Sequence, residues 1–285
     1  MLVAGGALRR PASRCRNAGS TSSSPTIFPR VRALSSSAAL PRDAGGARGR
    51  RPHPPHRDAA ILARDAEEAA LGTPCGLLDQ LAIRGAKPGR AALVDCGSGA
   101  RREIPLPPDL AILVVDSGEE RHLAATGYAD RVTECRTAAE LLARRAGRPG
   151  LRLGAAEPDL LAHFGESPEE ATLLRRARHV IGETARVREA AAALEAEDLE
   201  ALGRLVRASH ASLAGDFEVS TPRLDAIVAH ATRHAGCLGA RLLGAGFGGS
   251  VLVLGRVGRL AGLREHLEAI APRQAQILVA PVGAA

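Results

Sequence analysis

The charge of the chain changes abruptly near residue 58, and this change limits what the chain can fold into. Residues 1–57 contain eleven arginines and one acidic residue, Asp43, so the segment carries a net charge of +10. The whole chain carries +7, so residues 58–285 carry −3 by subtraction. The first segment shows no apolar periodicity and cannot bury enough surface to offset its ordering entropy. We expect it to be disordered or mis-read, and the folded body to begin at residue 58.

The basic segment allows three interpretations. It could bind nucleic acid non-specifically, act as an Arg- and Ser-rich organelle transit peptide, or form a solvated tail, which we favour. Because the folded body is mildly acidic, we expect no nucleic-acid partner. The longest apolar runs, such as residues 110–115, are far shorter than the ~20 residues of a membrane helix, so we expect no membrane partner.

Five cysteines are scattered along the chain without a CxxC pair. This spacing indicates neither a disulfide framework nor a zinc site, and it favours a reducing, cytoplasmic compartment. Only five aromatic residues occur, so the core must consist of Ala, Leu and Val. The sequence does not determine the oligomeric state, and we expect a monomer.

Apolar periodicity and Gly or Pro breaks predict the secondary structure. Helices are expected at 58–71, with Asp58 as N-cap, and at 75–84, 120–146, 169–214 (two helices), 224–236 and 260–270. Strands are expected at 91–96, 110–116, 249–254 and 276–281. This mixed order without strict βαβ alternation predicts an α+β fold rather than a doubly wound sheet.

A glycine-rich segment, residues 244–250 (GAGFGGS), leads directly into a predicted strand. Glycine allows positive φ and a close approach of the backbone to another group. A tight turn or bulge is the more common role of such a segment, and a ligand-binding loop is the alternative.

Two acidic residues are candidates for chemistry. Asp79 lies one turn into a predicted helix among apolar neighbours, and partial burial there would suit a general base. Glu67 could bind a divalent cation through its carboxylate oxygens. A capping or helix-surface aspartate is the more common explanation for Asp79, and a solvated helix glutamate is the alternative for Glu67. Residues 35–37, three serines, could open a helix that binds phosphate, or they are low-complexity sequence.

Two other constellations are rejected. His230 and His234 have metal-ligand spacing, but no third ligand is evident. Ser209, His210 and Asp216 suggest a nucleophilic triad, but no G-x-S-x-G elbow is present. A solvated helix face explains the histidines more simply.

Seven ordered segments together resemble the galactokinase family, within the GHMP superfamily of small-molecule kinases. They are AEEAALGTPCGLLDQ (66–80), AALVDCGS (91–98), PLPPDLAILVVDSG (105–118), LAATGYADRVTEC (123–135), RARHVIGETARV (176–187), SHASLAGDFEVSTPRLD (209–225) and LGARLLGAGFGGS (238–250). The resemblance runs from about residue 58 to the C-terminus. It implies a two-lobed GHMP kinase fold with a deficient N-terminal lobe, residues 58–150, and a near-complete C-terminal domain, residues 151–285.

The resemblance also implies an activity and its site. The activity is the ATP- and Mg²⁺-dependent phosphorylation of galactose at the anomeric hydroxyl, giving galactose 1-phosphate. Asp79 matches the catalytic aspartate, and Gly76 and Tyr128 match residues that contact the sugar. Glu67 and Ser36 match Mg²⁺ ligands. The residues that match phosphate-binding positions are Ser35, Ser36, Ser37, Gly244, Gly246, Gly248 and Gly249.

The N-terminal part departs from the family pattern. The Glu-His-x-Asp-Tyr sugar run and its arginine are absent, and Val31 and Ala33 replace two expected glycines. We hypothesise a reading-frame shift or a wrongly assembled gene start before residue 58. Two alternatives therefore stay open, a galactokinase whose activity as this chain the sequence leaves undecided, and a non-catalytic sugar- and ATP-binding relative that acts through protein partners. Missing strands would expose a sheet edge, so we also expect marginal stability.

Overall fold

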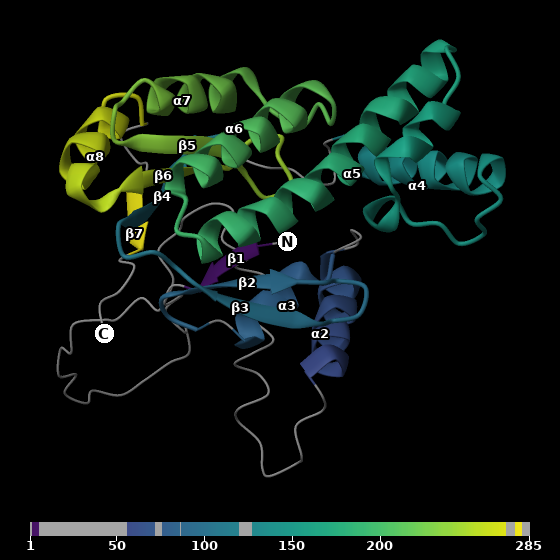
Figure 1. Ribbon diagram of the computed structural model, residues 1–285, viewed down its shortest axis with the longest axis horizontal. Helices are drawn as coiled ribbons and strands as arrows, with labels where there is room; N and C mark the ends of the chain where they lie inside the picture. The colour runs from purple at the N-terminus through teal and green to yellow at the C-terminus, as the bar shows by residue number, and fades with distance from the viewer. Residues whose placement is uncertain are drawn as a thin grey trace, which may run out of the picture.

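The computed structural model describes residues 2–5, 56–71, 76–85, 87–119, 127–271 and 277–280. Within these ranges the strands form two antiparallel sheets, with helices packed against both (Figure 1). One sheet has the strand order β1-β2-β3 and the other the order β5-β6-β4-β7. The predicted α+β class is confirmed.

The first sheet contains β1 (Leu2–Gly5), β2 (Arg90–Val94) and β3 (Arg101–Pro105). Helices α2 (His56–Leu71) and α3 (Leu78–Gly85) pack beside it (Figure 1). The buried side chains between helices and sheet are those of Ala60, Leu81, Ala92 and Val94. This layer carries Glu67 and Asp79.

Three features of this layer differ from the prediction. Leu2–Gly5 pairs antiparallel with β2, and α2 includes residues 56 and 57, so the expectation of disorder across residues 1–57 is wrong at these six residues. Helix α2 begins before Asp58, which therefore lies inside the first turn rather than at the N-cap. Strand β3 was not predicted, because its sequence RREIP is mostly charged and only Ile104 is fully buried. Charged residues are common on such an edge strand.

The second sheet contains β4 (Leu110–Asp116), β5 (Cys237–Leu243), β6 (Ser250–Arg256) and β7 (Ile277–Ala280). Strand β4 lies between β6 and β7, and all seven of its residues are buried. The pairing places β4 in the same sheet as the C-terminal strands. The predicted domain boundary at residue 150 therefore does not separate the two sheets.

The two faces of the second sheet have different cores, because successive strand side chains point to opposite faces. Leu113 and Val115 of β4 pack with α7 (Pro222–Thr232) and α8 (Leu260–Glu268). Leu110 and Ile112 pack with the ends of α5 (Pro168–Glu195) and α6 (Leu199–Gly215) that meet at residues 196–198.

The second of these cores also reaches the first sheet. Its buried residues include Ala91 and Ile104 of the first sheet, Leu194 of α5 and Leu254 of β6. One continuous apolar cluster therefore joins both sheets through α5.

A helical arm projects from the sheets (Figure 1). It consists of α4 (Tyr128–Arg145), the short 3₁₀ helices η2 (Leu153–Ala155) and η3 (Pro158–His163), and the first half of α5. A separate apolar cluster holds it together.

Two details of the arm follow from local sequence. The described part of the predicted helix 120–146 begins only at Tyr128, after the turn at Gly127, and residues 120–126 lie outside the described residues. Val132, predicted on its apolar side, is instead exposed, whereas Leu142 is fully buried. Helix α5 begins at an N-cap, Ser167, whose hydroxyl accepts a hydrogen bond from the Glu170 amide, as Ser caps commonly do.

None of the described helices is both long enough and apolar enough to cross a membrane. The predicted exposed sheet edge and marginal stability stay predictions.

Candidate functional site

The glycine loop, residues 244–249, connects β5 to β6 in a conformation that needs glycine. Gly244, Gly246, Gly248 and Gly249 have φ of +82°, +82°, +109° and +88°. A Cβ on Gly246 would lie 2.2 Å from the carbonyl oxygen of Val219. Close backbone packing therefore accounts for Gly246, as the turn interpretation predicts.

Two other loops hold the glycine loop. The amide of Phe247 donates to the Val219 carbonyl at 2.7 Å, and the amide of Ser117 donates to the Gly249 carbonyl at 2.8 Å. The Gly249 amide donates to the carbonyl of Glu119 at 3.2 Å. We call residues 116–119, 216–221 and 244–249 the three-loop site.

Glu119 and Thr221 fasten two of these loops through their side chains. The Thr221 hydroxyl donates to Oε2 of Glu119 at 2.6 Å, and it also accepts from the Leu224 amide as the N-cap of α7. Neither residue was singled out in the sequence, because the partners are 102 positions apart.

Tyr128, the predicted sugar contact, lies at the start of α4 beside the three-loop site. A Cβ on the preceding Gly127 would lie 3.3 Å from Cζ of Phe247 in the glycine loop. The Tyr128 side chain is partly buried. The structure therefore brings the start of α4, with Tyr128, close to the predicted phosphate-binding glycines.

A buried arginine, Arg176 on α5, connects the arm to the three-loop site. Its side chain is 2% exposed and bonds Glu134 of α4 and both Asp216 and Glu218 of the α6–α7 loop. The hydrogen bond from Arg176 lowers the pKa of the Glu218 carboxyl. Sequence reasoning missed Arg176, because a run of arginines on a helix resembles a solvated face.

The predicted catalytic and metal-binding carboxylates lie in the other layer, on α2 and α3. Asp79 is in the first turn of α3 and is exposed, which matches the helix-surface interpretation of this residue. Its predicted place on a helix is confirmed. Glu67 of α2 is partly buried, and its Oε2 accepts a hydrogen bond from Nε2 of Gln80 at 2.7 Å.

Gln80 joins the two helices, although sequence reasoning did not single it out. Its side chain is 3% exposed, and its Oε1 is buried without a hydrogen-bond partner among the described residues. The only sequence feature that could have indicated a role for Gln80 was its position next to Asp79 in the CGLLDQ segment. Because Gln80 follows Asp79 directly, its bond to Glu67 fixes the helix of Asp79 to that of Glu67.

Four predicted positions remain, Gly76 and the three serines 35–37. Gly76 is exposed, and nothing lies within 4 Å of a Cβ placed on it, so no packing contact accounts for glycine. Ser35, Ser36 and Ser37 lie outside the described residues.

The rejected constellations are also not assembled as sites. Among the described residues no group of three or more His, Cys, Asp or Glu could hold a metal ion. The ring of His230 stacks on that of His266 at 4.0 Å. Ser209 donates to Glu183, and His210 faces Asp225 at 3.2 Å rather than Asp216.

Comparisons with known proteins agree with this architecture. The family described as "GHMP kinases C terminal" matches residues 190–269. The galactokinase of Roseiflexus sp. (strain RS-1) is 44% identical over 197 residues, which cover 68% of this chain and 49% of that protein. The galactokinase of Homo sapiens is 40% identical over 202 residues, covering 68% of this chain and 48% of that protein.

A solved structure extends the match to three dimensions. The crystal structure of Lactococcus lactis galactokinase complexed with galactose has a TM-score of 0.72 and 28% sequence identity, covering 87% of this chain and 63% of that chain. The chain spans about half the length of the curated relatives it matches. Residues 190–269 match the C-terminal family of the GHMP kinases, and by sequence and by fold the chain is similar to the galactokinases.

Proposed function

We propose that the chain is a galactokinase, which transfers the γ-phosphoryl group of ATP to the anomeric hydroxyl of galactose and yields galactose 1-phosphate and ADP. The similarity to galactokinases, one of them solved with galactose bound, supports this substrate. We further propose that the enzyme works in the cytoplasm, where ATP is supplied and cysteines such as Cys96, free in the structure, stay reduced.

The bond between Gln80 and Glu67 carries the proposal. Phosphoryl transfer needs a group that orients the attacking hydroxyl and a cation that offsets phosphate charge, both held in fixed positions. Asp79 is the proposed orienting group and Glu67 the proposed cation ligand. The buried Gln80 side chain, 2.7 Å from Glu67, holds their helices together.

Glu67 fits Mg²⁺ chemically. In kinase sites Mg²⁺ is usually bound by one or two carboxylates together with the substrate phosphates. When bound, the ion neutralises negative charge on the phosphate oxygens. Ser36 is the second proposed ligand, outside the described residues.

Asp79 fits a role on the sugar because its carboxylate is exposed at the start of a helix. There it can accept the hydrogen bond of the anomeric hydroxyl and take its proton. We propose that Gly76 and Tyr128 contact the sugar. The glycine loop is proposed to close over the phosphates by its shape, since the Phe247 and Gly249 amides already bond within the protein.

The test is an assay of ADP release by the full chain with Mg²⁺, ATP and galactose. We expect Asp79→Asn to lower turnover at least 100-fold, within the range of general-base catalysis. Asp65→Asn is the matched control, because Asp65 is an exposed aspartate of α2 paired with Arg64. It should leave turnover unchanged.

Calorimetry with galactose separates the alternatives. Galactose binding without turnover would replace the proposal by a non-catalytic sugar-binding relative. Folded chain that neither binds galactose nor turns over would exclude both functions. Turnover that survives Asp79→Asn would exclude Asp79 as the catalytic residue.

A further inference from the structure

Arg176 holds three separate groups with one side chain. Its Nε donates to Oε2 of Glu134 at 2.6 Å, Nη1 to the carbonyl of Asp216 at 2.5 Å, and Nη2 to Oε2 of Glu218 at 2.6 Å. A buried charge is costly unless it is paired and hydrogen-bonded. The planar guanidinium also fixes the direction of each bond. The arm and the α6–α7 loop are therefore held in one relative position.

The loop that Arg176 holds is strained. Glu218 has φ of +54° although it is not glycine. Such a conformation persists where the surroundings determine it. Besides Arg176, Arg131 of α4 supplies this constraint, because its Nε donates to the carbonyl of Phe217 at 2.6 Å.

The strained loop in turn supports the glycine loop. Val219, the residue after Glu218, accepts the Phe247 amide at 2.7 Å. Its carbonyl oxygen also lies against Gly246, where a Cβ would be 2.2 Å away. A shift of residues 216–218 would move this contact, so the position of the glycine loop depends on the bonds of Arg176.

The same network reaches Tyr128 through α4. Glu134 and Arg131 lie on that helix, six and three residues after Tyr128. Both are tied to the α6–α7 loop, Glu134 through Arg176 and Arg131 directly. Gly127, next to Tyr128, lies against the ring of Phe247. The start of α4 and the glycine loop are thus fixed to a common support.

We propose that Arg176 is a positioning residue. Through the strained loop 216–218 it fixes the positions of the glycine loop and Tyr128 relative to each other. The catalytic consequence rests on the proposed function, whereas the structural consequence does not. An arginine that only stabilised the arm would not affect the glycine loop selectively.

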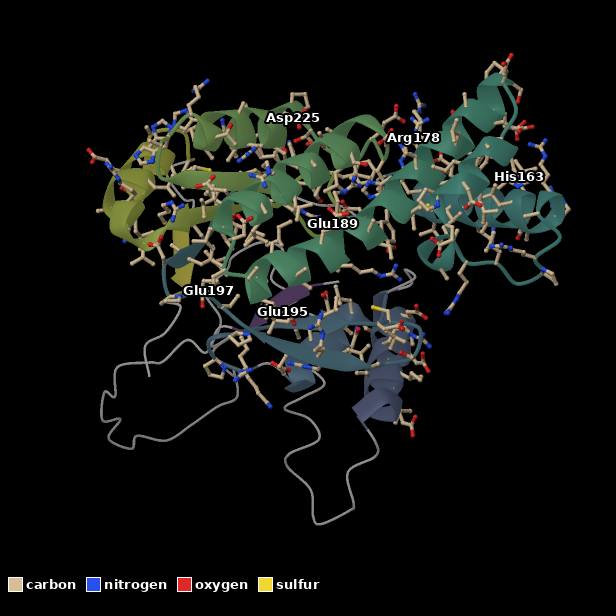
Figure 2. All side chains as sticks on the ribbon, viewed as in Figure 1. His163, Arg178, Glu189, Glu195, Glu197 and Asp225 are labelled. Atoms are coloured by element: carbon tan, nitrogen blue, oxygen red, sulfur yellow. The ribbon has the colours of Figure 1, made fainter. Side chains whose placement is uncertain are left out.

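The structural test measures amide hydrogen exchange in Arg176→Met. We expect the Phe247 and Gly249 amides to exchange at least tenfold faster, while amides within β6 change less than twofold. Arg178→Met is the matched control, since Arg178 lies on the same helix (Figure 2). Its side chain is 52% exposed, and its Nη1 lies 3.6 Å from a carboxylate oxygen of Asp216. It should leave both sets of amides unchanged.

The catalytic test measures kcat and KM for the same variants. Arg176→Met should lower kcat at least tenfold and raise KM for galactose, and Arg176→Lys, which keeps the charge, should recover part of both. Arg178→Met should change neither. If Arg176→Met does not fold, Glu218→Gln provides a second test. It weakens only the bond of Arg176 to Glu218, and it should increase exchange at the Phe247 and Gly249 amides by a smaller factor, again without affecting β6.

The outcomes are distinct. Exchange that rises uniformly, or that is unchanged at Phe247, overturns the positioning role. An inactive wild-type chain in which Arg176→Met still loosens the glycine loop selectively would contradict the proposed function and support the positioning role.

Discussion

His179 is a buried histidine of α5 that favours its uncharged form in the folded protein. Burial lowers its pKa from the ordinary 6.5 to about 4. Its ring stacks on Phe217 with centroids 4.3 Å apart, and its Nδ1 lies 3.0 Å from the hydroxyl of Ser212. Ser212 in turn donates to Asp216, so His179 packs against the loop that Arg176 holds.

This burial predicts a pH-dependent stability. Between pH 6.5 and 4 the unfolded chain binds the His179 proton and the folded chain does not, so the free energy of unfolding falls as pH falls. The pKa shift corresponds to a loss of roughly 3 kcal/mol in the free energy of unfolding as the pH falls from 6.5 to 4. Above pH 6.5 His179 makes no further contribution to the pH dependence. Urea unfolding at pH 7, 5.5 and 4.5 should show the loss.

His179→Gln should remove this part of the pH dependence. His163→Gln is the control, because His163 is an exposed histidine of the arm (Figure 2). It should keep the wild-type pH dependence. An equal slope in the wild type and His179→Gln would show that other groups cause the acid loss.

At the scale of elements, a pair of glycines lets α6 approach β5. A Cβ on Gly203 of α6 would lie 2.3 Å from the carbonyl oxygen of Leu238, and one on Gly239 of β5 would lie 2.5 Å from the carbonyl oxygen of Gly203. Strand β5 was not predicted, since glycine usually weakens a strand. Here Gly239 marks the approach of another backbone.

We expect Gly203→Ala to lower the free energy of unfolding by about 1–3 kcal/mol, because the helix must move away from the strand. Gly215→Ala at the end of the same helix has open space and should raise it by about 0.5 kcal/mol. Denaturant unfolding of both variants tests this. Equal effects of the two substitutions would mean that α6 and β5 are not in close backbone contact.

At the scale of the whole molecule, α5 joins the parts of the fold. Its first half belongs to the core of the arm, and its second half belongs to the cluster shared by both sheets. The two sheets should therefore unfold together, although the arm has its own core.

Leu194→Ala and Leu142→Ala test this coupling. Both residues are at most 2% exposed, one in the shared cluster and one in the arm. Each substitution should lower the free energy of unfolding by about 2–5 kcal/mol. In Leu194→Ala the amides of β2 and of β6 should both exchange faster, whereas in Leu142→Ala only the amides of the arm should exchange faster. Loosening of one sheet alone by Leu194→Ala would show that the sheets are independent.

The sequence by itself determined the elements whose pattern is local. Apolar periodicity located α5, α6 and β4, and four glycines before an apolar run located the glycine loop at the start of β6. The ordered motifs indicated the family, and the apolar periodicity of residues 75–84 placed Asp79 on a helix. These features depend on neighbours within a few residues, which a sequence displays directly.

Only the tertiary structure decided which distant groups meet. Burial of Arg176 depends on Glu134 and Glu218, each 42 positions away. The bond of Gln80 to Glu67 depends on how α3 packs on α2, and the pairing of Leu2–Gly5 with β2 spans most of the N-terminal half. The sequence of a helix rich in arginine is the same whether those arginines are solvated or paired with buried carboxylates. The difference arises from the carboxylates and carbonyls that the fold brings to it, because a buried charge is stable only with such partners.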